Sequence, residues 1–219
     1  MQPTGAYTAE RASALSGVPM STIHYWSREA VLAPSVSAER VKLWSYSDLI
    51  GLRIIYWLRR EKTDAAGAAI PRTGMKSIRR ALARLRELDE PMGRADETPL
   101  WIDRAGRLYV RGRSGPETVA GQTIMTGAVN LIAPFQTREG LRGPDLARPR
   151  SDLRIAPGRL SGAPHIIHTR LETRALSALA RDGLDPDAIG NLYPYVTAEQ
   201  IVQALELERQ LEENLRVAA

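Results

Sequence analysis

A short segment at residues 16–26, SGVPMSTIHYW, combines glycine and proline with a run of polar side chains. Its clear apolar anchors are Ile23 and Trp26, three residues apart, so a helix here would turn one narrow stripe toward a core. The other face carries hydroxyls, an imidazole, a phenol and a guanidinium, from Ser21, Thr22, His24, Tyr25 and Arg28. Such groups bind base edges and phosphates, so this face predicts contact with DNA. An ordinary solvent-exposed helix is the alternative interpretation.

The residues before this segment predict a helix that would position it. Thr8 suits the N-cap, and Glu10 in the first turn suits the helix dipole. Gly17 can adopt a positive φ and end that helix, and Pro19 is tolerated in the first turn of the next. Two short helices joined by a glycine-containing turn are typical of a helix-turn-helix, whose second helix presents its N-terminal residues to DNA.

The chain then continues with a loop, a β-prone stretch and another helix. The loop contains Pro34, and the stretch VKLWSY follows it. Ser47 is predicted to cap the next helix, with Asp48 in its first turn. We therefore expect a winged helix-turn-helix domain at residues 1–90.

This order of motifs resembles the MerR family of winged-helix regulators over residues 7–60. In that family the stretch after the turn is similar to TIRYYE, and here it is TIHYWS at Thr22–Ser27. The resemblance implies that Arg40 and Lys42, in the wing, lie along the sugar–phosphate backbone. It also implies a weaker phosphate or base contact at His24, which replaces the usual arginine.

Charge is distributed unevenly along the 219 residues. Residues 1–115 carry 19 Lys/Arg and 12 Asp/Glu, whereas residues 155–219 carry 6 and 9. A basic first half attracts polyanions and an acidic last half repels them, so DNA contact is expected in the first half. The chain has no cysteine, no apolar run long enough to cross a bilayer and no signal-peptide pattern, so we expect a cytoplasmic protein without a membrane partner.

The middle of the chain is expected to be a β-containing connector at residues 91–135. It follows MKSIRRALARLREL, a predicted helix with Ile78, Leu82 and Leu85 at helical spacing. PLWIDRAGRLYV predicts a hairpin with its turn around Asp103–Gly106, and VAGQTIMTGAVNLIAPF predicts a further strand. Residues 136–154 are rich in Gly and Pro and aperiodic, which predicts a linker.

Residues 155–219 predict three helices behind a short β-like segment. RALSALARDG forms a helix closed by Gly183, and Asp185 with Pro186 begins a short helix that ends before Pro194. Thr197 and Gln200 form a capping box that opens a long last helix, from about 198 to 215. Tyr193 and Tyr195 are expected to be core and turn residues.

This last region is similar to a small homeodomain-like family of unknown formal function. The shared pattern is SG-x-P-x-I-x-x-TR at Ser161–Arg170, followed by spaced positions from Gly183 to Leu205 that include Tyr193, Pro194, Thr197 and Glu199. Many members have glycine where this chain has His168. Members are encoded beside PIN-like ribonucleases and act as their antitoxins. With the MerR-like first domain, the chain resembles a long VapB-type antitoxin.

The arginines around the predicted linker are candidates for binding such a toxin. PIN-like ribonucleases gather carboxylates around divalent metal, and a guanidinium binds carboxylates with two parallel hydrogen bonds. A breaker-rich segment could become ordered on entering that site. The candidate toxin-binding residues are Arg138, Arg142, Arg148, Arg150 and Arg154. The alternative is that they are solvated charges and that the three-helix domain alone covers the toxin.

Enzyme functions find no support in the sequence. There is no Gly-rich phosphate loop, HExxH or GxSxG motif, and His165 and His168 would face opposite sides of a strand, so we expect neither catalysis nor a metal or other cofactor. Glu206, Glu208, Glu212 and Glu213 would repel phosphates, so we expect the last domain to bind protein rather than DNA.

We therefore expect a mainly α fold with small β elements: a winged helix-turn-helix, the connector, the linker and a tri-helical homeodomain-like domain at residues 155–219. The favoured function is a DNA-binding antitoxin that represses its own operon and binds a PIN-like ribonuclease, as a homodimer or a larger complex with the toxin. A stand-alone MerR-like regulator with a ligand-sensing C-terminal half is the alternative, and a scaffold that does not bind DNA is a third possibility.

Overall fold

A computed structural model describes residues 5–60, 62–63, 69–80, 100–102, 108–112, 115–118, 129–130, 134–136 and 142–217. In these ranges the protein is mainly helical with small β elements, as predicted. The named helices are α1 (Ala9–Ser16), α2 (Met20–Arg28), α3 (Tyr46–Leu58), the 3₁₀ turn η1 (Leu160–Gly162), α5 (Thr173–Arg181), α6 (Pro186–Leu192) and α7 (Ala198–Val217). A further helical segment covers residues 75–80, where Ile78 is fully buried as expected; Leu82 and Leu85 lie outside the described residues.

The strands are short and all their pairings are antiparallel. They are β1 (Lys62–Thr63), β2 (Ala69–Ile70), β3 (Leu100–Ile102), β4 (Leu108–Gly112), β5 (Gly115–Thr118), β6 (Val129–Asn130), β7 (Phe135–Gln136), β8 (Arg142–Gly143), β9 (Leu153–Arg154) and β10 (His165–Ile166). Four of them form one sheet in the order β5-β4-β3-β6, and the others pair as β1-β2, β7-β8 and β9-β10.

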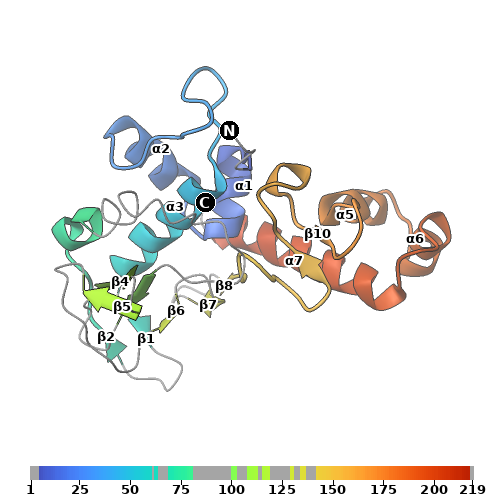
Figure 1. Cartoon of the computed structure of the whole chain (residues 1–219). Coiled ribbons are helices and arrows are strands. Elements are labelled where there is room, and N and C mark those ends of the chain that lie inside the picture. The colour runs from blue at the N-terminus through green and yellow to red at the C-terminus, as the bar shows by residue number, and fades with distance from the viewer. Residues whose placement is uncertain are drawn as a thin grey trace.

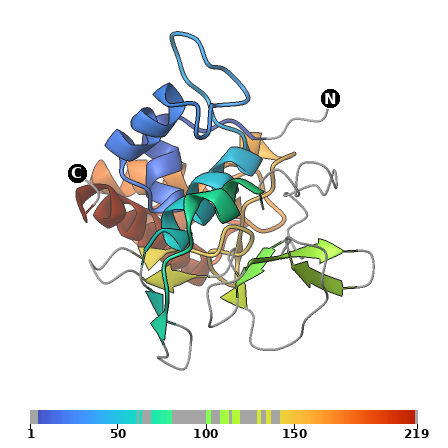
Figure 2. The same ribbon diagram turned by 90° about the vertical axis from the view of Figure 1, so that its left-hand side faces the viewer.

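The predicted hairpin and the strand after it are present in the four-stranded sheet. β3 pairs with β4 so that Ile102 opposes Leu108, and β6 adds to the other edge of β3. The predicted turn residues lie outside the described residues. β5, which the sequence analysis did not predict, extends the sheet beyond β4. In Figure 2 the ribbon of this sheet lies to one side of the bundle of helices.

The first two helices begin and end as the sequence predicts. The Thr8 side chain accepts a hydrogen bond from the backbone N–H of Arg11, and Gly17 ends α1 with φ +74°. α2 then starts directly after Pro19, which is its N-cap. Helices α1 and α2 thus form the expected helix-turn-helix.

Helix α3 is the central helix of the first half, and nearly all of its residues are buried. Its N-cap is Ser45, so the prediction of Ser47 is wrong. Ser45 and Asp48 form a reciprocal capping box, which requires a spacing of three residues. Arg53 is fully buried and donates from Nη2 to the carbonyl of Leu15 at 2.6 Å, at the negative end of α1. Burial lowers the pKa of Arg53 to about 9, partly offset by Tyr46 and Asp145.

The described part of the predicted linker packs against the protein instead of lying in solvent. Leu146, Leu153 and Ile155 are fully buried, and the Leu146 carbonyl accepts a hydrogen bond from the Tyr46 hydroxyl on α3. Glycines and prolines break regular structure here, but they do not prevent the apolar side chains between them from entering a core. Within the predicted linker, residues 142–154 are therefore an ordered segment that contributes apolar side chains to the core.

The last part of the chain contains the three predicted helices. Asp185 caps α6 by accepting from the N–H of Ala188, with Pro186 in the first turn. Thr197 and Gln200 form the predicted capping box at the start of α7. Figure 1 shows α7 running from the end that carries α6 back to α1, so this helix joins the two halves of the molecule.

The two histidines of this region have separate roles. His165 is buried, and its Nδ1 lies 2.9 Å from the carbonyl of Ala163. Burial lowers its pKa, so it is neutral at pH 7. His168 is exposed and has φ +61°, a conformation that glycine adopts at less cost. Glycine at this position would adopt the same backbone without the strain of a Cβ.

Candidate functional site

The exposed face of α2 is formed by the side chains that the sequence predicted for DNA contact. Ile23 and Trp26 are buried, while Ser21, His24, Tyr25 and Arg28 are exposed and Thr22 is partly buried. The Arg28 guanidinium lies 5.7 Å from the centre of the Tyr25 ring and its Nε lies 3.7 Å from the Glu29 carboxylate. Both side chains are largely exposed to solvent, so this ion pair is weak and the Arg28 guanidinium can still bind an anion.

The predicted wing is a loop beside α2. Ser37 and Leu43 exchange backbone hydrogen bonds of 3.1 and 2.8 Å and close the loop, with Arg40 exposed within it. In Figure 1 the loop extends away from the helices, above α2. Lys42 is partly buried and donates to the Ser27 hydroxyl at 3.0 Å, so it attaches the loop to α2.

His24 connects the exposed face of α2 to the segment that precedes α3. Its ring lies edge-on to that of Trp44, with centres 6.4 Å apart, and Trp44 is fully buried just before α3. Trp44 also exchanges two backbone hydrogen bonds with Tyr7, the residue before the α1 cap. Trp44 therefore links α2, through His24, to the start of α1, through Tyr7.

The candidate toxin-binding arginines do not form one free segment. Arg142 pairs with Glu213, and Arg150 donates to the Gln210 side chain at 2.7 Å, so both are attached to α7. Arg154 donates to the carbonyls of Ser151 and Leu153. Arg148 is exposed, and Arg138 lies outside the described residues. Residues 142–154 are thus ordered in the protein alone. The expectation was a segment that becomes ordered on entering the toxin's active site.

Behind α2, a second set of charged residues joins α1 to the C-terminal domain. Arg11 donates two hydrogen bonds of 2.7 Å to the carboxylate of Glu208 on α7. Their side chains are only 19% and 6% exposed. The expectation that Glu208 is a surface charge is therefore wrong. Its other partner is the Thr173 hydroxyl at the start of α5.

Competing effects set the ionisation of Glu208. Burial alone would raise its pKa, but hydrogen bonds from Arg11 and Thr173 and the charge of Arg11 together hold the pKa below its ordinary value. The carboxylate is therefore charged at neutral pH, and the Arg11 pair is a true ion pair between the two halves. Breaking one side of such a pair would strand the other charge out of water.

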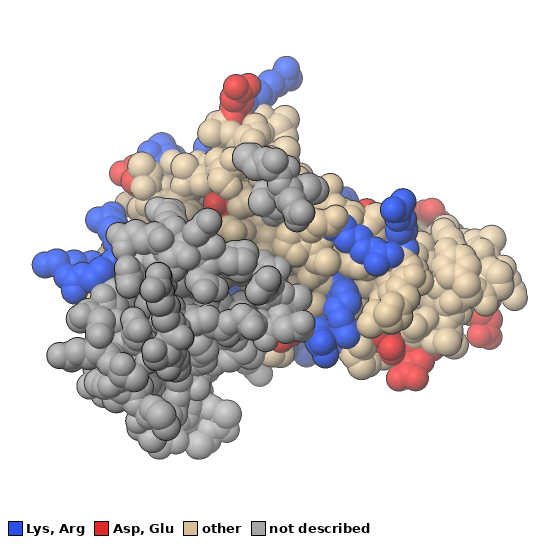
Figure 3. All heavy atoms as spheres, viewed as in Figure 1, with Lys and Arg blue, Asp and Glu red and all other residues tan. Residues whose placement is uncertain are grey.

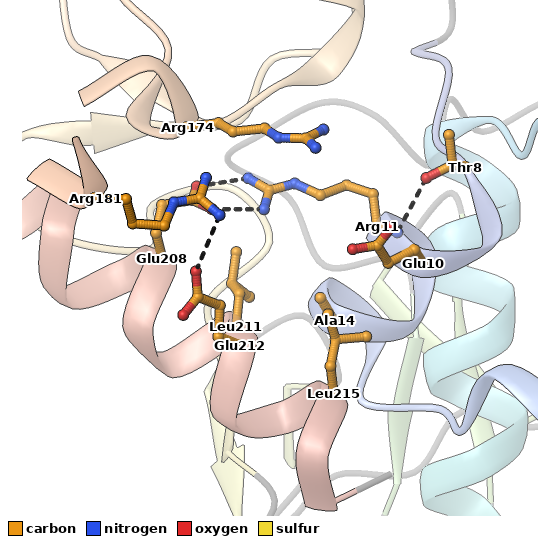
Figure 4. Close-up of a pocket in the computed structure, with 10 residues that line it drawn as sticks. All are labelled: Thr8, Glu10, Arg11, Ala14, Arg174, Arg181, Glu208, Leu211, Glu212 and Leu215. Atoms are coloured by element: carbon orange, nitrogen blue, oxygen red, sulfur yellow. Dashed lines mark hydrogen bonds and ion pairs between the residues drawn. The ribbon is translucent and has the colours of Figure 1, made fainter. Parts of the chain in front are cut away.

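Two clefts flank this ion pair, and both are lined by Thr8, Arg11 and Arg174. One, of about 70 Å³, extends along α7 to Glu212 and Leu215. Figure 4 shows Arg174 reaching across it above the Arg11–Glu208 pair, and Arg181 beside Glu212 at 4.0 Å. The other, of about 220 Å³, lies between the segment before α1 and residues 160–164.

The sequence contains no pattern that predicts the contact between Arg11 and Glu208. Arg11 and Glu208 are 197 residues apart, and each occupies an ordinary position on an amphipathic helix. Local patterns contain no signal that would join them.

No group of three or more His, Cys, Asp or Glu side chains within the described ranges is arranged to hold a metal ion. Among the helices described, none is long and apolar enough to span a membrane.

Comparison with known proteins gives one family and one fold. Residues 154–207 match the model of a family described as protein of unknown function (DUF433). No curated protein matches the sequence. The structure is similar to the crystal structure of Rv2018 from Mycobacterium tuberculosis, with a TM-score of 0.51 and 16% sequence identity. The alignment covers 93% of this chain and 97% of that one, so the shared fold extends over both halves.

Proposed function

We propose that this protein is a DNA-binding antitoxin that represses its own operon and neutralises a PIN-like ribonuclease. The observation that carries the proposal is the exposed polar face of α2, backed by buried Ile23 and Trp26 and flanked by the loop that holds Arg40. A helix in the major groove and a neighbouring basic loop on the phosphates is the geometry of helix-turn-helix readers.

The C-terminal half supplies the second part of the proposal. Residues 154–207 match a family of unknown function. The SG-x-P pattern and the spaced positions after it resemble antitoxins encoded beside PIN-like ribonucleases, and this resemblance supports a toxin as the partner. The arginines near α7 are suited to carboxylates of a metal-binding nuclease site, because guanidinium binds carboxylate through two donors. Arg142 and Arg150 would have to exchange their contacts on α7 for contacts with the toxin.

DNA binding is tested by the salt dependence of gel shifts with promoter DNA from the protein's own operon. The Arg28→Ala/Arg40→Ala variant should bind more weakly, and the slope of log K against log salt should flatten by about two units, one for each lost phosphate contact. The matched control is Arg170→Ala/Arg209→Ala, which removes the same charge from exposed positions outside the α2 face. Equal slopes for both variants would show that α2 and its loop do not bind DNA.

Toxin neutralisation is tested by co-expression with the product of the neighbouring reading frame. The unaltered chain should form a stable complex with it and suppress its RNA cleavage. Replacing Arg138, Arg142, Arg148, Arg150 and Arg154 by Ala should restore cleavage while some complex remains. Full inhibition by this variant would show that the arginines do not block the toxin's active site.

A ligand-responsive regulator is the second candidate, favoured by the cleft of about 220 Å³ between the two halves. A small anion bound near Arg174 would contact both halves and could alter how α2 is held. Promoter binding that changes with an added metabolite, in the absence of any toxin, would support it.

A further inference from the structure

Large apolar side chains are exposed in two places in the described structure. Met20, Tyr25, Val36 and Val41 belong to α2 and its loop, where DNA binding is proposed. At the other end of the molecule, Leu192, Tyr195 and Val202 are 56%, 63% and 42% exposed. The only other such residue described is Val217, near the chain end. The second group has no role in the DNA face.

These three residues lie close to the turn that joins α6 to α7. Leu192 ends α6, Tyr195 lies in the turn, and Val202 is in the second turn of α7. The turn itself is well defined: Val196 N–H donates to the carbonyl of Tyr193, and the rings of Tyr193 and Tyr195 meet edge to face at 6.1 Å. The Tyr195 ring already contacts Tyr193 within the chain, which lowers the entropy cost of burying it in an interface.

The surroundings of this group carry charge of a single sign. From residue 182 to 206 the chain has no Lys or Arg, and its five acidic residues are all exposed: Asp182, Asp185, Asp187, Glu199 and Glu206. We call these five and the three apolar residues the distal corner. In Figure 3, acidic side chains lie at the upper and lower edges of the end that carries α6, and the basic ones on that face lie toward the middle of the molecule. An apolar centre with a charged rim is the usual anatomy of a protein interface.

We propose that the distal corner docks onto the basic, RNA-binding surface of the ribonuclease partner. This inference rests on the proposed function. A ribonuclease must attract phosphates with a surface rich in Lys and Arg. The distal corner has the opposite charge and supplies apolar residues for the centre of the contact. It would therefore cover the path of the RNA, while the arginines near α7 serve the active-site carboxylates.

The same charge argument disfavours two other occupants. DNA would meet five carboxylates, so the corner is not a second DNA reader. Two copies of this chain joined corner to corner would place like charges together, which costs free energy. A head-to-tail contact with the arginines of a second copy is the remaining alternative, and it would give open-ended assembly.

The test measures the affinity of full-length chain for the purified product of the neighbouring reading frame, and inhibition of its RNA cleavage. Leu192→Ser/Tyr195→Ser/Val202→Ser should weaken binding by at least about tenfold, since buried aromatic and aliphatic anchors dominate interfaces. Asp187→Lys/Glu199→Lys should weaken it several-fold at low salt and less at high salt. Both variants alter exposed residues, and circular dichroism melts check that they fold.

The control is Tyr25→Ser/Val41→Ser, which removes exposed apolar residues from the other end of the molecule. It should leave toxin affinity unchanged and weaken promoter binding. Unchanged toxin affinity in both corner variants, with the unaltered chain binding normally, overturns the corner and leaves the antitoxin function intact. If the unaltered chain does not bind that product, both proposals fail. If sedimentation velocity shows that the corner variants lose self-association instead, the occupant is a second copy.

Discussion

At the scale of single residues, one glycine shows how the two halves constrain each other. Gly162 has φ +82°, and a Cβ there would lie 2.1 Å from the Tyr7 hydroxyl oxygen. That hydroxyl donates to the Gly162 carbonyl at 2.8 Å, joining the segment before α1 to the C-terminal domain. Burial also raises the pKa of Tyr7, so it remains a neutral donor. The glycine in the SG-x-P pattern is thus required by a residue from the other half.

Gly162→Ala should lower the free energy of unfolding by more than 2 kcal/mol, because the strained φ and the displaced Tyr7 ring add together. Gly183→Ala is the matched control, since its φ is +96° but a Cβ would meet nothing within 4 Å. It should cost about 1 kcal/mol from backbone strain alone. Urea unfolding of both variants measures the difference. Equal losses would mean that the Tyr7 contact contributes nothing.

At the scale of elements, α7 is the helix on which the other parts of the described core converge. It contacts α5 and α6 within its own domain, and it receives Arg11 from α1 and Asn214-mediated hydrogen bonds to Ala14 and Arg142. The same helix therefore buries one face in the three-helix domain and another against the helix-turn-helix. We therefore expect a substitution of Glu208 to destabilise both halves of the molecule.

Glu208→Gln should destabilise the protein by about 3 kcal/mol, the low end for a broken buried pair because Arg11 keeps some solvent contact. The pH dependence follows from the lowered pKa of Glu208. The folded protein holds the carboxylate charged at a pH where the unfolded chain begins to bind a proton, so its stabilisation is complete above about pH 4.5 and is lost as pH falls through the lower folded pKa.

Urea midpoints between pH 3 and 7 measure this dependence for the unaltered chain and for Glu208→Gln. The difference between the two should shrink as pH falls below 4.5. The control is Glu206→Gln, an exposed carboxylate two residues away on α7. A pH-independent difference between the unaltered chain and Glu208→Gln would contradict the ion pair.

At the scale of the whole molecule, the two halves share one continuous core. Tyr7, Arg11 and Ala14 on one side meet Gly162, Glu208 and Asn214 on the other, and the segment around Leu146 packs onto α3. We therefore expect the halves to unfold together rather than as independent domains.

The distribution of tryptophan makes cooperative unfolding measurable. All four Trp residues, at positions 26, 44, 57 and 101, lie in the first half, so fluorescence reports on that half. Ile189→Ala on α6 removes a fully buried side chain from the other half and should cost about 2–4 kcal/mol. If the molecule is one cooperative unit, the fluorescence midpoint in urea shifts as much as the helical circular dichroism signal. A fluorescence midpoint that stays unchanged would mean that the halves unfold separately.

The sequence by itself determined the local features of this protein. Thr8, Gly17, Asp185 and the Thr197–Gln200 pair specify helix ends through contacts that span at most a few residues, so their spacing could be recognised. The spacing of Ser45 and Asp48 contains the same signal, although Ser47, directly before Asp48, is also a residue type that caps helices. The division of α2 into a buried stripe and an exposed polar face also followed from periodicity alone.

Only the tertiary structure decided which distant residues meet. The Arg11–Glu208 pair and the Tyr7–Gly162 hydrogen bond join positions 197 and 155 residues apart, and no local pattern distinguishes a buried glutamate on α7 from its exposed neighbours. The same holds for residues 142–154, whose glycines and prolines resemble a linker while Leu146 and Leu153 enter the core. Propensities and caps act through neighbouring backbone groups, whereas burial depends on the surface that another part of the chain presents.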